Sequence, residues 1–341
     1  MTIELPVLRL GFAGFSQEEQ EKLAIMVPSV AVGVVHWEIC DLDRADAWLV
    51  NGSRVQELDD GRIRIGAGVP SAHSIKINPS EMDRPIAFTS PVRLNVPSFT
   101  FDLASRPSLA AVLHKFEGWL SPVIAQFCLA ANIVENQTAL RSGVFDLRNN
   151  GVVLAVVSMH GETGVLPSVA PPDMDEAVWS RQPAEMVIPD NFARATMSQL
   201  MWQFATRTQQ DVLPSHYRSG ALYFRRPPRV AQRQLDDSHL YLLRELSAAP
   251  ATFEALQRRS GMGDEQLSRH LAALYFVGSI TSNPKRAARP PARQAGTMAD
   301  ADLPSGPASN LPSGLDSVPP DLARRNGADP DFTAPAPIGL L

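Results

Sequence analysis

The chain has little of several features that mark particular protein classes. Its 341 residues contain only two cysteines, Cys40 and Cys128, far apart and each in an apolar setting. This pattern predicts two buried free thiols, with one disulfide as the alternative, and two thiols without a nearby histidine do not predict a zinc site. The longest uncharged run through an apolar region is 17 residues, from Gly118 to Val134. It is too short and too polar to span a membrane.

An excess of positive charge is also missing. Lys and Arg number 31 against 36 Asp and Glu, which gives a net charge of -5. Proteins that bind polyanions owe most of their non-specific affinity to neutralised phosphates. Any role in binding nucleic acid would therefore need a local basic patch. The first residues, Met1 to Pro6, show no basic segment followed by an apolar one, so no signal peptide is predicted and we expect a cytoplasmic protein.

Catalytic motifs are absent as well. The sequence contains no GxxxxGKS or GxxxxGKT phosphate loop, no GxGxxG fingerprint and no GxSxG nucleophile turn. None of the seven histidines forms an HxxxH pair. His160 and Glu162, expected on one face of a strand, supply two ligands, which do not make a metal site. We therefore expect no catalytic residue, no cofactor and no metal site, and a protein that is not an enzyme.

The first hundred residues alternate strand and helix signals. Ser16 and Glu19 form a capping box that opens a helix to about Met26. Strands are predicted at the following segments: 7–15, 31–40, 47–52 with Asn51-Gly52 at its end, 62–68 and 84–92. Strands interleaved with helices predict an α/β domain with a mostly parallel sheet.

The order of these segments over residues 6–130 resembles a CheY-like receiver domain. In that family a phosphate-accepting aspartate ends the third strand, an acidic pair follows the first, and a threonine or serine ends the fourth. Here Asn51 stands at the phospho-acceptor position, residues 11–16 offer no acidic pair, and Thr89 or Ser90 stands at the fourth. The resemblance implies a pseudo-receiver that neither accepts a phosphoryl group nor holds Mg²⁺. Another flavodoxin-like sheet would give the same pattern.

A long helix is predicted from Pro107 to about Val134, bent at Pro122. It is an internal packing helix or, alternatively, a face for a dimer or a partner. An α+β region follows, in which Asn149-Asn150-Gly151 predicts a hairpin and Asp190 is expected to cap a helix.

Residues 237–283 predict three short helices and a strand. Thr252 is the expected N-cap of the second helix and Gly261 its end, the third runs to about Phe276, and Gly278 leads into the strand. The phrase from Leu267 to Leu274, followed by Val277-Gly278-Ser279-Ile280, is similar to the ArsR-type regulators. The resemblance implies a winged helix-turn-helix, a fold that serves DNA binding in some proteins and protein contacts in others.

The charges around this third helix favour protein contacts over DNA. Its first turn carries Asp264 and Glu265, which suit a helix N-terminus but repel the phosphates that a DNA-reading helix meets there. The residues that remain candidates for contact with nucleic acid or a partner are Ser268, Arg269, His270, Arg258, Arg259, Arg225, Arg226 and Arg229. The last three belong to a basic run with aromatic neighbours, which either stacks on bases or is simply solvated.

The predicted organisation has four parts. These are a receiver-like α/β domain ending in the long helix at 1–138, an α+β middle region at 139–235, a winged helix at 236–283 and a tail at 284–341. The tail holds 11 of the 29 prolines and few aromatics, which predicts disorder. We expect a non-catalytic bacterial regulatory or signalling protein that acts on protein partners, with an undetermined oligomeric state. The alternative is a DNA-binding regulator with an N-terminal sensor domain.

Overall fold

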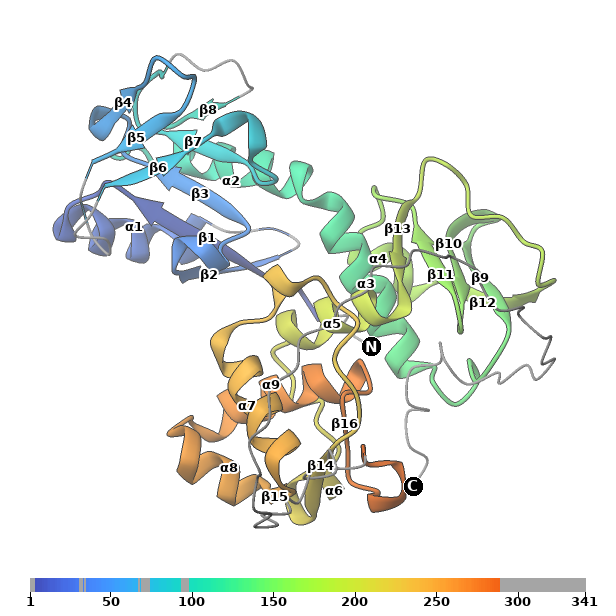
Figure 1. Ribbon diagram of the computed structural model, residues 1–341. Helices are drawn as coiled ribbons and strands as arrows, with labels where there is room; N and C mark the ends of the chain where they lie inside the picture. Colours follow the sequence, from blue (N-terminus) through green and yellow to red (C-terminus); the bar gives the residue numbers. More distant parts are fainter. Residues whose placement is uncertain are drawn as a thin grey trace, which may run out of the picture.

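A computed structural model describes residues 4–30, 33, 35–66, 68, 74–92 and 98–288. Three parts meet in it (Figure 1): a sheet with its helices at the N-terminus, a second sheet reached through a long helical connection, and a C-terminal helical part that lies against both. Part of the strand expected at 31–40 and the tail beyond Ala288 lie outside the described residues. Residues 284–288, which the sequence places in the tail, are described and begin with a short 3-10 helix, Pro284–Arg286.

The N-terminal sheet is parallel, as the sequence predicts. Its strands are β1 (Val7–Ala13), β2 (His36–Cys40), β3 (Ala47–Val50), β7 (Ile86–Phe88) and β8 (Phe99–Thr100), in the order β2-β1-β3-β7-β8. Each neighbouring pair is parallel. The predicted capping box opens α1 (Gln17–Val30): the backbone N–H of Ser16 donates to Glu19 at 2.8 Å, and that of Glu19 donates to the Ser16 hydroxyl at 3.3 Å.

The two faces of this sheet are covered by different structures. Alternate residues such as Leu10 and Leu49 face a helical layer made of α1 and α2 (Arg106–Trp119). Trp48, Val50 and Phe88 face a small antiparallel sheet of β4 (Val55–Glu57), β5 (Ile63–Ile65) and β6 (Ile75–Ile77). The sequence predicts a strand at β5, but it does not show that these three strands replace the helices that usually cover the second face of such a sheet.

The predicted long helix is two helices. α2 ends at Trp119, and α3 (Ser121–Glu135) begins after Leu120, with Pro122 in its first turn. Proline is favoured in a first turn because the N–H that it lacks has no partner there. Pro122 therefore starts a second helix rather than bending one. α3 is buried on most of its surface, and its Phe127, Cys128 and Leu129 are fully enclosed.

The second sheet is antiparallel and packs on α3. Its order is β12-β9-β10-β11-β13, with β9 (Val144–Asn149), β10 (Val152–Ser158), β11 (Glu162–Val165), β12 (Val178–Gln182) and β13 (Ala193–Thr196). A short helix, α4 (Pro171–Asp175), joins β11 to β12. The predicted hairpin is present between β9 and β10, where Asn150 and Gly151 have φ values of 49° and 81°.

The helix expected after Asp190 begins later. α5 (Met197–Arg207) is capped by Thr196, whose hydroxyl accepts the Gln199 N–H at 3.2 Å, so the capping prediction for Asp190 is wrong. Residues 193–196 instead form β13, because they pair with β11. α5 lies between α3 and the C-terminal helices, with Leu200, Trp202 and Phe204 buried.

The C-terminal part contains the predicted helices and their caps. These are α7 (Asp237–Ala248), α8 (Phe253–Ser260) and α9 (Asp264–Phe276). Thr252 caps α8 through the Ala255 N–H, and Gly261 ends it with φ 70°. A short helix, α6 (His216–Ser219), precedes β14 (Ala221–Phe224), which pairs with β15 (Ala251–Thr252) and β16 (Ile280–Thr281). Strand β14 thus joins the helical part across the boundary that the sequence suggests at residue 235. Below, residues 216–288 are called the helical module.

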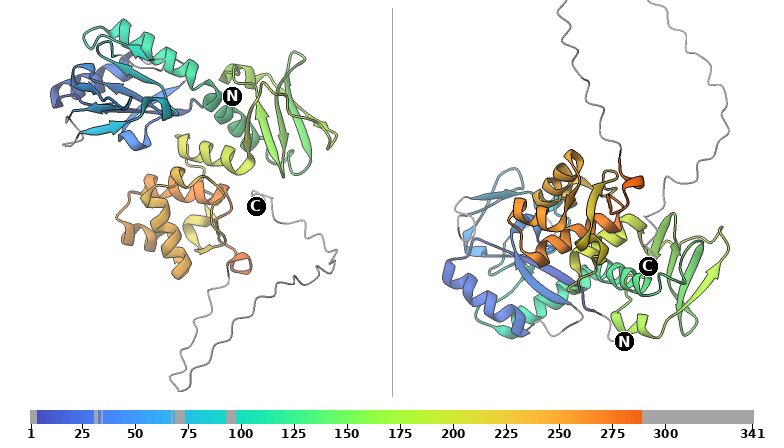
Figure 2. Two further views of the ribbon diagram at one scale, coloured as in Figure 1. Left: turned by 45° about the horizontal axis from the view of Figure 1, so that its top comes forward. Right: turned by 90° about the horizontal axis from the view of Figure 1, so that it is seen from below.

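One hydrophobic core runs through all three parts, from Leu8 in β1 to Ile280 in β16. Polar bonds reinforce the contact between the N-terminal sheet and α5. Arg207 donates to both carboxylate oxygens of Asp46 at 2.6 Å, and Arg9 donates to the carbonyl of Thr206 at 2.6 Å. The left view of Figure 2 shows α5 between the helical module and the other two parts. Among the described residues, none of the helices combines the length and the apolar character needed to cross a membrane.

Candidate functional site

The candidate contact residues on α9 point in different directions. Arg269 is exposed, together with Asp264, Glu265 and Gln266 in the first turn. Ser268 and His270 are buried, with 3% and 7% of their surface exposed. All residues from Leu271 to Phe276 are buried as well. The only outward-facing part of α9 is therefore its acidic first turn and Arg269.

Ser268 is held by polar groups of the same chain. Its hydroxyl donates to Asp211 at 2.6 Å and accepts a hydrogen bond from Arg218 at 2.9 Å. Arg218 also forms ion pairs with Asp211 at 2.5 Å and with Asp264 at 3.0 Å. Burial alone would raise the pKa of Asp211, but the hydrogen bonds from Ser268 and Arg218 outweigh it and the pKa lies below its ordinary value.

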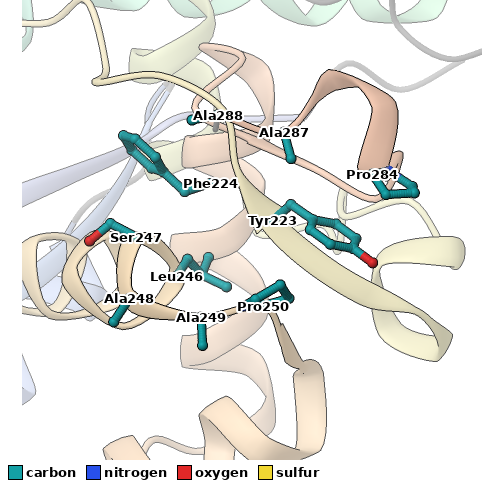
Figure 3. Close-up of a pocket in the computed structure, with 10 residues that line it drawn as sticks. All are labelled: Tyr223, Phe224, Leu246, Ser247, Ala248, Ala249, Pro250, Pro284, Ala287 and Ala288. Atoms are coloured by element: carbon teal, nitrogen blue, oxygen red, sulfur yellow. The ribbon is translucent and has the colours of Figure 1, made fainter. Parts of the chain in front are cut away.

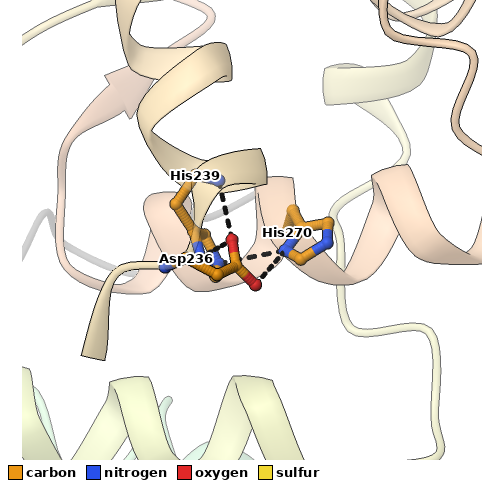
Figure 4. Close-up of side chains that lie close together, drawn as sticks. All are labelled: Asp236, His239 and His270. Atoms are coloured by element: carbon orange, nitrogen blue, oxygen red, sulfur yellow. Dashed lines mark hydrogen bonds and ion pairs between the residues drawn. The ribbon is translucent and has the colours of Figure 1, made fainter. Parts of the chain in front are cut away.

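His270 belongs to a buried network with Asp236 and His239 (Figure 4). Asp236 caps α7: its carboxylate accepts the His239 N–H at 2.9 Å and lies 2.7 Å from His239 Nδ1. His239 Nε2 lies 3.1 Å from His270 Nδ1. The other carboxylate oxygen of Asp236 accepts a 2.7 Å hydrogen bond from Arg44 of the N-terminal domain. The network thus joins α7 and α9 to the segment between β2 and β3.

Burial and the contacts within this network change the pKa values of His270 and Asp236. Burial, followed by the neighbouring His239, lowers the pKa of His270 from 6.5 to about 4. Burial alone would raise the pKa of Asp236, but the hydrogen bonds and charge of His239 lower it far below its ordinary value. At neutral pH the pair therefore consists of an ionised Asp236 and a neutral His270. The Trp202 ring covers His239 with a centroid separation of 4.6 Å.

Within the part of the chain that the structure describes, Asp236, His239 and His270 form the one group of three possible metal ligands. Two imidazoles and a carboxylate suit zinc and related metals. The donor atoms, however, are already used: one oxygen of Asp236 contacts His239 and the other contacts Arg44. Nε2 of His239 and Nδ1 of His270 contact each other. A cation would have to displace Arg44 and separate the rings. The geometry fits a closed hydrogen-bond network better than a metal centre.

The candidate arginines outside α9 form two separate groups. Arg258 and Arg259 are exposed at the end of α8, and Arg259 pairs with Glu245 at 3.3 Å. Arg225 and Arg226 are half-buried and Arg229 is exposed in the segment after β14. Burial, followed by the charges of Arg225 and Arg229, lowers the pKa of Arg226. These three arginines therefore share one positively charged patch.

Asn51, at the phospho-acceptor position, is buried and hydrogen-bonded to its neighbours. Asn51 follows β3 and is 7% exposed. Its amide oxygen accepts hydrogen bonds from the Ser53 hydroxyl at 2.7 Å and the Thr89 hydroxyl at 3.2 Å, and its amide nitrogen donates to Glu19 at 3.3 Å. The structure thus brings Asn51 and Thr89 together, as the resemblance implies. An amide cannot take up a phosphoryl group as a carboxylate does, and the nearby Glu19 is one carboxylate rather than an acidic pair.

Sequence reasoning missed most of the partners in these networks. Asp211, Asp236, His239 and Arg44 were not candidate residues, although an aspartate three positions before His239 is a recognisable helix-capping signal. Arg218 was a candidate only as the first arginine of the basic run that also holds Arg225, Arg226 and Arg229. His160 and Glu162 do not share a strand, because His160 lies in the turn before β11.

No protein-family model, no curated protein and no solved structure matches this chain.

Proposed function

We propose that this is a non-catalytic regulatory protein that works through contacts with a protein partner. Its N-terminal domain would be a pseudo-receiver, and its helical module a winged helix that serves protein contact. The observation that carries the proposal is the orientation of α9: Ser268 and His270, two of the candidates for contact with nucleic acid or a partner, are buried and bonded to Asp211, Arg218 and His239. A helix fastened in this way offers little side-chain surface to a DNA groove.

The arrangement of the parallel sheet supports the pseudo-receiver. Counted along the chain within that sheet, its strands stand in the order 2-1-3-4-5, which occurs in flavodoxin-like and receiver domains. Asn51 and Thr89 occupy the ends of the third and fourth of these strands, with 3.2 Å between the Asn51 amide oxygen and the Thr89 hydroxyl. The layer of β4, β5 and β6 departs from the family pattern. A domain of this kind would signal through its surface rather than through phosphorylation.

The ion pairs between the parts support a regulatory role in which a partner bound to one part affects another. Arg207 and Asp46 join α5 to the N-terminal domain, and Arg44 joins Asp236 at the start of α7. Because the carboxylate of Asp236 also holds His239, a partner that moves the N-terminal domain would disturb α7 and α9 together. This coupling is what a regulatory protein without catalytic residues needs.

The partner surface can be tested first on the N-terminal domain. Ile25 on α1 is 71% exposed, and Ile39 on the edge strand β2 is 38% exposed, an apolar combination that suits protein contact. The full chain, carrying a photo-crosslinking residue at position 22, would be irradiated in cells and the adduct identified by mass spectrometry. We expect one dominant protein adduct that Ile25→Asp removes. Val187→Asp is the matched control, because Val187 lies between β12 and β13 and is 78% exposed.

Two further results would decide against the proposal. Acyl-phosphate labelling of the native chain by acetyl phosphate would contradict the pseudo-receiver. Binding to a DNA duplex with an affinity that falls steeply as salt rises, and that Arg269→Ala weakens, would favour the DNA-binding regulator. We expect neither, because Asn51 replaces the carboxylate and Asp264 and Glu265 oppose phosphate at the exposed end of α9.

A further inference from the structure

The helical module carries an apolar groove of about 390 Å³. Its lining comes from Tyr223 and Phe224 of β14, whose rings point to opposite sides of the strand, from Leu246 and Pro250 at and after the end of α7, and from Pro284 and Ala288 (Figure 3). Two aromatic rings and two prolines around an apolar floor resemble the surfaces that bind proline-rich peptides in an extended conformation. The groove is separate from the networks around Ser268 and His270.

The described chain ends at the rim of this groove. Ala288 lines it, and the backbone N–H of Ala288 donates to the carbonyl of Phe224 at 2.8 Å. The following residues, 289–341, therefore start beside the groove. Forty residues, 289–328, lie between Ala288 and the last thirteen residues of the sequence. A flexible chain of that length spans roughly 35 Å, which would give a segment at its far end an effective concentration in the millimolar range.

The last residues of the chain match the groove in chemistry. Residues 329–341 read DPDFTAPAPIGLL, with three prolines, one phenylalanine and three aliphatic residues at the end. They also carry Asp329, Asp331 and the terminal carboxylate. The residues next to the groove in sequence are basic: Arg225 and Arg226 follow Phe224, and Lys285 and Arg286 follow Pro284. A proline-rich apolar segment with acidic residues thus matches an apolar groove whose lining residues Phe224 and Pro284 have basic neighbours in the sequence.

We propose that the groove of the helical module binds the C-terminal segment 329–341 of the same chain. The prolines and Phe332 would occupy the apolar floor, and Asp329 and Asp331 would pair with the basic residues at the rim. A segment tethered so close binds even when its intrinsic affinity is weak, because its partner is always within reach. A protein partner with a similar segment would have to displace it. The proposal is independent of whether the proposed function holds.

Hydrogen exchange on the full chain tests this contact. The native chain would be compared with a full-length variant in which Phe332, Ile338 and Leu340 are each changed to Ser. We expect exchange to be at least several-fold faster in the variant at residues 222–225 and 246–250, and unchanged in β9 and β10. A synthetic peptide of residues 329–341, added to the variant, should restore the protection, and a scrambled peptide should not.

A change in the groove provides the reciprocal test. Ala248 lines the groove and is exposed, so Ala248→Glu adds bulk and negative charge there without disturbing the core. Ala111→Glu, at an exposed position of α2, is the matched control. In chains that already carry the three Ser changes, we expect Ala248→Glu to weaken binding of the peptide at least tenfold and Ala111→Glu to leave it unchanged.

Three outcomes would overturn the proposal. Equal exchange in the native chain and the Ser variant, with no binding of the peptide, would show that the segment does not occupy the groove. Peptide binding that Ala248→Glu does not affect would place the segment elsewhere. Protection that rises with protein concentration, together with a dimer in light scattering, would assign the groove to a second copy of the chain.

Discussion

At the scale of single residues, buried charges carry the clearest consequences. Asp46 and Arg207 face each other with two hydrogen bonds of 2.6 Å, and both side chains are nearly enclosed. Burial alone would raise the pKa of Asp46, but the charge and hydrogen bonds of Arg207 and the N–H of Arg9 lower it. Such a pair need not stabilise the fold more than apolar residues would, yet removing one partner leaves an uncompensated buried charge.

We therefore expect Asp46→Asn to destabilise the protein by about 3–5 kcal/mol. The measurement is urea unfolding followed by far-ultraviolet circular dichroism. Asp60→Asn is the control, because Asp60 pairs with Arg62 on the open surface. It should change the free energy of unfolding far less than Asp46→Asn does, because solvent screens an exposed pair. Equal effects of the two changes would mean that Asp46 and Arg207 are solvated.

His270 gives a prediction about pH. Its pKa is about 4 in the folded chain, against an ordinary value of 6.5, so the unfolded chain binds a proton first as the pH falls. The contribution of the neutral His270 to the free energy of unfolding is therefore complete above about pH 6.5 and is lost as the pH falls towards 4. The groups that face His270 are His239, Asp236, Arg44 and Arg269. Asp236 and Asp46, with lowered pKa values, lose their contribution only below about pH 4.

We expect the titration of His270 to decrease the free energy of unfolding by roughly 2 kcal/mol between pH 7 and pH 4.5. The His270→Gln variant, although less stable at pH 7, should show a distinctly shallower decrease over the same interval. Urea unfolding at a series of pH values measures both slopes. Parallel slopes for the two chains would show that His270 is not the group that titrates.

At the scale of elements, glycine positions separate backbone effects from packing. Gly261 ends α8 with φ 70°, and no atom lies within 4 Å of an added Cβ there. Gly118 lies within α2 with equally open surroundings. We expect Gly261→Ala to destabilise the protein by about 1 kcal/mol and Gly118→Ala to stabilise it by roughly 0.5–1 kcal/mol. Thermal unfolding should show shifts of opposite sign; shifts of the same sign would contradict the assigned helix ends.

Elements set by local chemistry are the ones that the sequence predicts. The turn at Asn150-Gly151, the Thr252 cap and the Gly261 end each depend on a few adjacent residues, and all three are confirmed. Asp190 and Thr196 are both capping residues by type. The pairing of β13 with β11 decides between them, and the local sequence does not contain that information.

The candidate site depends on contacts between distant residues, which is why the sequence predicts so little of it. His239 and His270 are 31 positions apart, and Arg207 is 161 positions from Asp46. Periodicity shows which residues of α9 are apolar, but Ser268 and His270 are polar and were expected outside. Both meet residues that are distant in the sequence: Ser268 bonds to Asp211 and Arg218, and His270 contacts His239 of α7.

At the scale of the whole molecule, the continuous core implies cooperative unfolding. The N-terminal sheet, α3, α5 and α9 share one buried cluster, and the Arg207–Asp46 and Arg44–Asp236 pairs cross the junctions. A partner that binds one part therefore acts on a single connected body. The central feature of that body is that α9 is held inward through Ser268 and His270.

Thiol reactivity of two adjacent positions on α9 tests this feature most directly. Ser268→Cys and Arg269→Cys would each be made in the full chain with Cys40 changed to Ser, since Cys128 is buried. The rate of reaction with a thiol reagent at pH 8 then reports the exposure of each side chain. We predict that the cysteine at 269 reacts like a free thiol and that the one at 268 reacts at least about a hundredfold more slowly, because it must wait for local opening. Equal, fast rates at both positions would contradict the inward orientation of α9 and would return the helix to the candidates for reading DNA.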